Sequence, residues 1–128
     1  MQPRFRRNAI IVLVVFTALV HLAAAFDGRL FEPGTTLPDP LFALNGLGFL
    51  GLLGAYFLPI PFFQERHKIV WWMLFSYICV TLVAWLVIWV GFNVIRDGKP
   101  FFGPDSLYGV PAKISEITLL YLLKSDKP

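Results

Sequence analysis

The chain has 128 residues, of which 57% are hydrophobic and only 15% are charged. A soluble domain is about half apolar and about a quarter charged, so this composition argues against an ordinary soluble fold and indicates a membrane protein. The net charge of +3 comes from basic residues at the ends of apolar segments. This placement does not form the clustered basic patch of a nucleic-acid-binding surface.

Four apolar segments follow one another along the chain, and we expect each to form a membrane-spanning helix. They cover about residues 8–26, 41–63, 69–95 and 106–123. The first three reach the roughly 20 apolar residues that a hydrocarbon core about 30 Å thick requires. The fourth contains Lys113 and Glu116, but the isoleucine and leucine residues around them still favour a spanning helix. The sequence therefore predicts an all-α fold in which residues 1–128 form one integral membrane four-helix bundle.

Proline residues separate the first three segments. Pro33, Pro38 and Pro40 lie in the first connection, and Pro59 and Pro61 lie at the end of the second segment. Proline lacks a backbone N–H and disfavours helical conformation in the residue before it. We therefore expect the helices to end at these positions.

The basic residues in the connections predict the orientation of the chain. Seven Lys and Arg residues lie before the first segment, between the second and third, or after the fourth, and three lie in the other two connections. Cytoplasmic loops carry the excess of Lys and Arg. We therefore expect a multi-pass protein of the cell (plasma) membrane with both termini cytoplasmic. One alternative stays open, because Arg4–Arg7, the apolar segment and Ala23–Ala25 also fit a cleavable secretory signal, which would leave three helices.

Four strongly polar side chains fall inside the apolar segments, namely His21, Asn45, Lys113 and Glu116. At a rise of about 1.5 Å per residue, all four lie in the external half of the bilayer. Lys113 and Glu116 are three residues apart, so they share a helix face and can pair. A polar group in lipid needs a partner or a water-filled cavity. We therefore predict a buried polar cluster as the candidate binding site.

The second and third segments supply further residues to the expected interior. Tyr77 and Thr81 are four residues apart in the third segment and lie on one helix face, where they can support the cluster. Gly48, Gly51 and Ala55 share one arc of the second segment. Small residues let another helix approach closely, so this arc is also a candidate surface for self-association or for other membrane-protein subunits.

Three interpretations of the polar cluster stay open. It can be structural, because interhelical hydrogen bonds of about 0.6 kcal/mol each fix which helices pair. It can instead bind a proton, an ion or a small polar ligand, because a histidine beside a carboxylate can titrate near neutral pH. Haem or another metal is the third, but His67 lies in a connection, so two histidine ligands cannot come from the apolar segments of one chain. The single Cys79 gives no metal framework. We expect no metal and no cofactor.

The sequence carries no P-loop, no HExxH, no CxxC and no nucleophile elbow. We therefore expect no enzymatic activity. A small chain with little extramembrane mass and 16% aromatic residues favours an accessory or assembly subunit of a larger membrane complex, without chemistry of its own. Its partners would be the lipid bilayer and other membrane subunits, and no nucleic acid. The alternative is a small transporter or sensor with a proton or small-solute site in the external half of the bilayer.

Short motifs along the chain also carry a family resemblance: Ala18–Leu22, Leu44–Leu50, Ser76-Tyr77 with Thr81, and Gly109 with Lys113 and Glu116. Over nearly its whole length, the chain resembles an uncharacterised family of small four-helix integral membrane proteins of bacteria and archaea. The resemblance implies a four-helix membrane bundle with a polar cluster that acts as one unit, and it implies no activity. Val110-Pro111 stands just before Lys113, and we expect the proline to start the fourth helix late and shorten this span.

Overall fold

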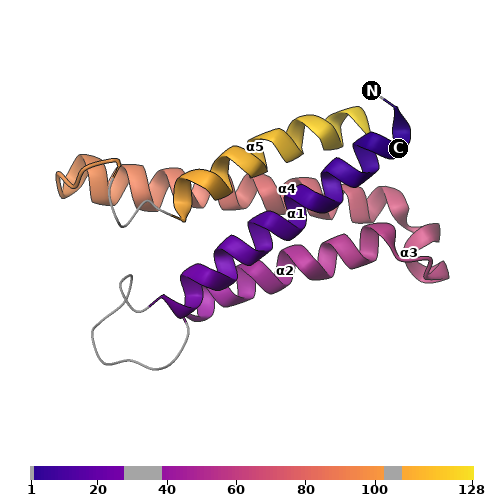
Figure 1. Cartoon of the computed structure of the whole chain (residues 1–128), viewed down its shortest axis with the longest axis horizontal. Coiled ribbons are helices and arrows are strands. Elements are labelled where there is room, and N and C mark those ends of the chain that lie inside the picture. Colours follow the sequence, from indigo (N-terminus) through magenta and orange to yellow (C-terminus); the bar gives the residue numbers. More distant parts are fainter. Residues whose placement is uncertain (1, 28–38, 103–107) are drawn as a thin grey trace.

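The computed structural model describes residues 2–27, 39–102 and 108–128, and within these ranges the chain is helical without any strand (Figure 1). The elements are α1 (Pro3–Phe26), α2 (Pro40–Phe57), α3 (Pro61–Glu65), α4 (His67–Trp85), the π-helical η1 (Leu86–Arg96) and α5 (Gly109–Ser125). α4 and η1 form one continuous helix from His67 to Arg96. The expected all-α fold is confirmed.

Three of the four expected spans are long and apolar enough to cross a membrane: α1, α2 and the continuous α4–η1 helix. The prediction of membrane-length helices is confirmed for these three, by length and composition. α5 does not meet the same test, because it has only 17 residues. It begins at Gly109, and residues 106–107 of the expected segment lie outside the described residues. Pro111 falls in its first turn, where the missing N–H breaks no helical hydrogen bond.

The second helix is shorter than the expected segment 41–63. Its start is fixed by Asp39, whose carboxylate accepts hydrogen bonds from the backbone N–H groups of Leu41 at 2.8 Å and Phe42 at 3.2 Å. α2 ends at Phe57, because the ring of Pro59 favours an extended conformation in the preceding residue. The remaining residues of the expected segment form a turn and the short α3. The extension of the second helix to residue 63 was therefore wrong.

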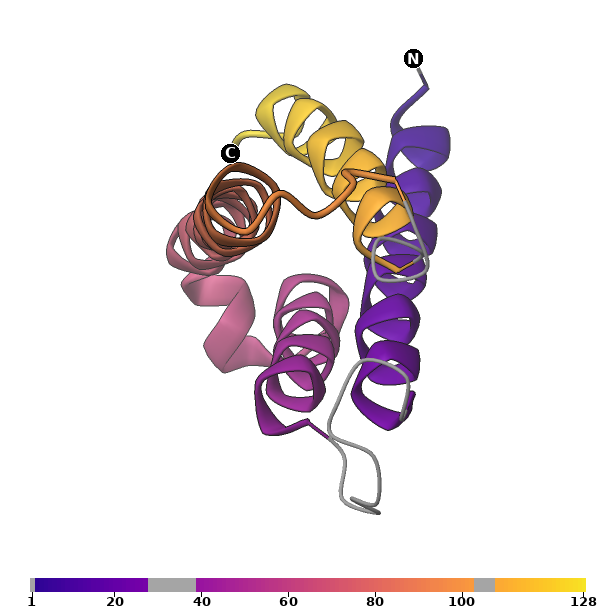
Figure 2. The same ribbon diagram turned by 90° about the vertical axis from the view of Figure 1, so that its left-hand side faces the viewer.

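The long helices pack in a ring. α1 contacts α2 and α5, and α4 contacts the same two helices. In the end-on view of Figure 2, α1, α2, α4 and α5 accordingly surround a common centre. On α1 the spacing of four residues from Ile10 to Val14 to Ala18 places all three on the face that points into the ring. The other fully buried apolar side chains of the centre are Phe49, Leu74, Ile78, Leu119 and Leu123.

The closest approach between α1 and α2 depends on Gly46. A Cβ atom at this position would lie 2.9 Å from the carbonyl oxygen of Ala18 and 2.7 Å from Cγ of Leu22. Real Cβ atoms essentially never approach other atoms this closely. The sequence reasoning did not single out Gly46, because nothing in the sequence tells which face of α2 meets α1.

The small residues that were singled out on α2 have different surroundings. Gly48 lies against the phenol ring of Tyr77 in α4, so the space beside this glycine is filled by a side chain of the same chain. Ala55 packs against the buried core. Gly51 has no atom within 4 Å of its Cβ position. Of the three, only Gly51 faces open space where a second copy or another subunit could approach.

The two ends of the chain meet at the end of the ring that also holds α3 (Figure 1). Arg6 of α1 forms an ion pair of 2.9 Å with Asp126, which follows α5. The same carboxylate accepts a hydrogen bond of 2.6 Å from the hydroxyl of Tyr56 in α2. Arg6 also donates to the carbonyl oxygen of Ser125 at 3.0 Å. The N-terminal and C-terminal segments therefore lie on the same side of the protein.

Candidate functional site

The centre of the candidate site is the pair formed by Lys113 and Glu116 on α5. Nζ of Lys113 lies 2.7 Å from Oε2 of Glu116, as their spacing of three residues on a helix allows. Glu116 is fully buried and Lys113 is 7% exposed. Charged side chains are almost never buried to this degree unless they are paired. The pair faces the interior of the ring.

α4 contributes Thr81 to this pair. The Thr81 hydroxyl has one proton, which it can donate to Oε2 of Glu116 at 3.2 Å or to the carbonyl oxygen of Ile78 at 2.8 Å. Nζ of Lys113 in turn donates to the backbone carbonyl of Thr81 at 3.4 Å. The charged pair therefore holds α4 and α5 together.

α1 contributes His21, and the contacts of this ring identify its tautomer. Nδ1 lies 2.7 Å from the carbonyl oxygen of Thr17. A carbonyl oxygen can only accept, so Nδ1 carries a proton and donates it. The other ring nitrogen, Nε2, faces Oε1 of Glu116 at 3.7 Å. This oxygen is buried and has no hydrogen-bond partner among the described residues.

His21 also packs against aromatic rings of the described residues. The rings of Phe42 and Phe49 in α2 lie with their centroids 6.2 Å and 5.8 Å from that of the imidazole. His21 is only 5% exposed. Among the described residues, the charged neighbours of His21 are two residues of α5, Glu116 in contact and Lys113 beyond it.

Two hydroxyl residues that the sequence reasoning missed complete the junction between α1 and α5. Thr17 Oγ1 and Ser115 Oγ are 2.8 Å apart, and both side chains are buried. Each can donate to the carbonyl oxygen of Ala112, Thr17 at 3.3 Å and Ser115 at 2.8 Å. Their positions in the sequence could have identified them, because Thr17 is one helical turn before His21 and Ser115 lies between Lys113 and Glu116. Ser and Thr can also bond to their own helix, which hides this role.

Asn45 does not join the charged residues. Only its backbone carbonyl takes part, as the acceptor of a 3.1 Å hydrogen bond from the Tyr77 hydroxyl. Its side chain makes no hydrogen bond to the described residues. Tyr77 also packs edge-on against Phe49 at 5.0 Å between centroids. Asn45 and Tyr77 thus form a separate link between α2 and α4.

The groups brought together are one carboxylate, one ammonium, one imidazole and three hydroxyls. Within the described ranges, no three His, Cys, Asp or Glu side chains gather as a metal ion would require. Comparison with protein-family models, curated proteins and solved structures finds no match for the chain. All of these groups can form hydrogen bonds, and the His21 imidazole and the Glu116 carboxylate are groups that can take up or release a proton.

Proposed function

We propose that the protein crosses the cell membrane four times as a bundle, with α5 as the fourth span. Lys113 and Glu116 of α5 point into the ring, and large apolar side chains lie on the outward surface of the same helix. Ile114, Ile117 and Tyr121 are 61%, 59% and 70% exposed. Such a surface suits lipid, while the inward charges have the partners that a membrane interior demands. Because Lys113 and Glu116 pair with each other inside the ring, these two charges are compatible with a membrane-spanning α5.

We also propose that both termini are cytoplasmic. The N-terminal arginines, the α3 connection and the C-terminal lysines lie at one end, where Arg6 and Asp126 join the terminal segments. Fusion of green fluorescent protein after Pro128 should give fluorescent cells, and alkaline phosphatase fused after Gly98 should be active outside. Inactive phosphatase would contradict this orientation. An N-terminus found beyond Ala25 in the purified protein would instead support a cleaved signal.

We infer that the polar cluster binds a proton taken up from the external side, as part of a sensor or transporter. The observation that carries this proposal is Oε1 of Glu116, which is buried, accepts no hydrogen bond from the described residues and lies 3.7 Å from Nε2 of His21. Because Nδ1 is committed to Thr17, Nε2 of the neutral ring has a lone pair, and so does Oε1. One added proton between them would turn two facing acceptors into a charge-assisted hydrogen bond.

The contacts favour a proton over a larger solute. Lys113 Nζ and Thr81 Oγ1 both lie within hydrogen-bond distance of Oε2 of Glu116. A proton can therefore enter without separating them. Because His21 belongs to α1 and Glu116 to α5, the new bond would tighten α1 against α5. Such a change in helix packing is how a charge change can become a signal.

Nitrogen NMR of the histidine rings tests the proton site in the full chain, held in lipid nanodiscs. Between about pH 9 and pH 4 we expect Nε2 of His21 to gain a proton, while Nδ1 keeps its proton throughout. His67, the only other histidine, is the internal reference, and a His67→Gln variant assigns the two signals. Glu116→Gln should lose the change at Nε2 in this range. A wild-type Nε2 that stays unprotonated down to pH 4 would rule the site out.

A second candidate function is an accessory or assembly subunit of a larger membrane complex, and η1 favours it. This segment contains no buried residue, and no described helix other than α4, which it continues, packs on it. Its exposed apolar side chains include Val87, Ile88 and Ile95. The last 11 of the 30 residues in the continuous α4–η1 helix are therefore left for lipid or a partner helix to cover. After mild extraction, a particle with the mass of one chain alone would count against this candidate.

A further inference from the structure

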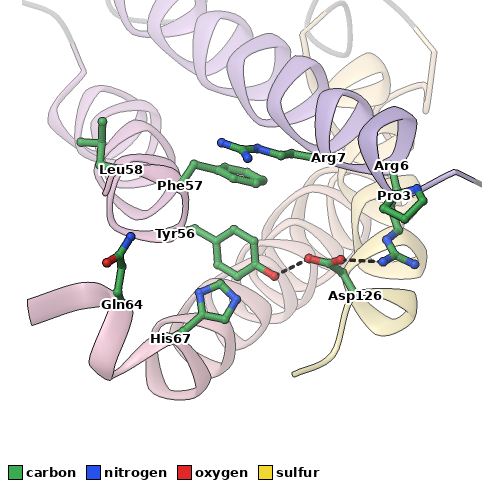
Figure 3. A pocket seen from close by; sticks show the side chains of 9 residues that line it. All are labelled: Pro3, Arg6, Arg7, Tyr56, Phe57, Leu58, Gln64, His67 and Asp126. Carbon is green, nitrogen blue, oxygen red and sulfur yellow. Dashed lines mark hydrogen bonds and ion pairs between the residues drawn. The ribbon is translucent and has the colours of Figure 1, made fainter. Parts of the chain in front are cut away.

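A polar cavity lies at the end of the ring that holds both termini. Its volume is about 420 Å³, and it is bounded by the start of α1, the end of α2, α3 and the start of α4. Figure 3 shows the side chains around it. Its polar lining consists of Arg6, Arg7, Tyr56, Gln64, His67 and Asp126.

The lining carries an excess of positive charge and of unused hydrogen-bond donors. The one carboxylate, Asp126, is already engaged by Arg6 at 2.9 Å and by the Tyr56 hydroxyl at 2.6 Å (Figure 3). Arg7 forms no ion pair with the described residues, and its guanidinium lies over the ring of Phe57 at 5.1 Å. The side chain of Gln64 makes no hydrogen bond within the described ranges. An anion would satisfy these donors.

The position and the rim of the cavity indicate an amphiphilic anion. The cavity lies where the apolar helices α1 and α2 reach the end with the basic residues. Trp71 and Trp72 lie at this same end, with Lys127 Nζ 6.0 Å and 5.6 Å from their ring centres. Tryptophan is typical of the headgroup level of a membrane. The other lining residues, Phe57, Leu58 and Pro3, are apolar. An ion with a hydrocarbon tail fits both parts of this lining.

We propose that this cavity binds the phosphate headgroup of an anionic phospholipid of the cytoplasmic leaflet. Arg7 would donate to the phosphate oxygens, because guanidinium groups suit phosphate geometry. Gln64 would add an amide donor, and Phe57 and Leu58 would lie beside the first part of the acyl chain. This inference rests on the proposed membrane orientation. A failure of that orientation would appear in the reporter fusions and not in a count of bound lipid.

Native mass spectrometry of the full chain tests the lipid site. The purified protein in detergent is offered equal amounts of phosphatidylglycerol and phosphatidylcholine with the same acyl chains. We expect the wild-type chain to retain phosphatidylglycerol in clear preference. Arg7→Gln should reduce this preference roughly fivefold, as the loss of one arginine at an anionic membrane surface implies. Arg7 makes no ion pair to lose, so the variant should fold.

Arg4→Gln is the matched control, because Arg4 is exposed on the same helical turn and does not line the cavity. It should leave the preference unchanged. Equal retention of the two lipids by the wild-type chain would overturn the proposal, and so would an Arg4→Gln effect as large as that of Arg7→Gln. A third arm adds inorganic phosphate in excess. Retention of phosphatidylglycerol would support a lipid site, and its displacement would assign the cavity to a soluble anion instead.

Discussion

Replacing Lys113 by methionine should destabilise the folded protein by about 3–5 kcal/mol, the usual cost of removing one partner of a buried ion pair. The reason is the position of Glu116, which is fully buried and has its main counter-charge 2.7 Å away. Glu116→Gln should cost less. The lysine that it leaves behind has a long flexible stem and lies in the outer part of α5, so its ammonium can move toward water.

The double variant Lys113→Met with Glu116→Gln should recover most of the lost stability, because it removes both charges together. Unfolding of each variant in mixed micelles, followed by tryptophan fluorescence, gives the coupling energy of the pair. Lys124→Met is the control, because Lys124 is exposed on the same helix and should change stability by less than about 0.5 kcal/mol. If the effects of the two single substitutions simply add, the two charges do not stabilise each other.

The proton site adds a dependence on pH to this result. In Lys113→Met the buried carboxylate still faces Nε2 of His21 at 3.7 Å. Acid can neutralise the carboxylate directly or give His21 a positive charge that replaces the ammonium. Both routes relieve the buried charge, so the variant should lose less stability relative to the wild-type chain as the pH falls. A cost that stays constant with pH would mean that His21 and Glu116 do not exchange protons with the solution.

Much of the cluster could be predicted from the sequence because helical spacing fixes which side chains share a face. Lys113 and Glu116 follow from their spacing of three residues, and Thr81 follows from the helix face that it shares with Tyr77. His21 follows from its depth in the expected first helix. Each of them meets at least one of the others in the structure. The same argument from depth wrongly placed the Asn45 side chain in the cluster. It lies at a similar level, but the facing direction of its side chain depends on the order of helices around the ring.

Other features of the fold could not be predicted, because the sequence is equally compatible with more than one structure at these positions. Hydropathy continues through residues 58–63, so the end of α2 depends on Pro59 and not on the apolar pattern. Thr17 and Ser115 are ordinary in an apolar helix, and only their mutual distance of 2.8 Å shows that they join α1 to α5. Positive-inside counting uses residues at the ends of helices, and the internal packing of the ring is the same for either orientation.

Gly46→Ala should destabilise the protein by about 1–3 kcal/mol, the usual cost of overpacking a close contact. The added methyl group would lie 2.9 Å from the carbonyl oxygen of Ala18, and a backbone atom cannot rotate away as a side chain can. α1 would have to move away from α2. His21, which lies one turn beyond Ala18, would then lose its ring contact with Phe49.

Gly51→Ala is the matched control on the same helix, because no atom lies within 4 Å of its Cβ position. Alanine favours a helix over glycine by up to about 1 kcal/mol, so this variant should be as stable as the wild-type chain or slightly more so. Denaturation in mixed micelles gives both values, and NMR of His21 shows whether its surroundings change in Gly46→Ala alone. Equal stability of the two variants would mean that α1 and α2 can separate without cost, and that the fixed position of His21 opposite Glu116 does not depend on α2.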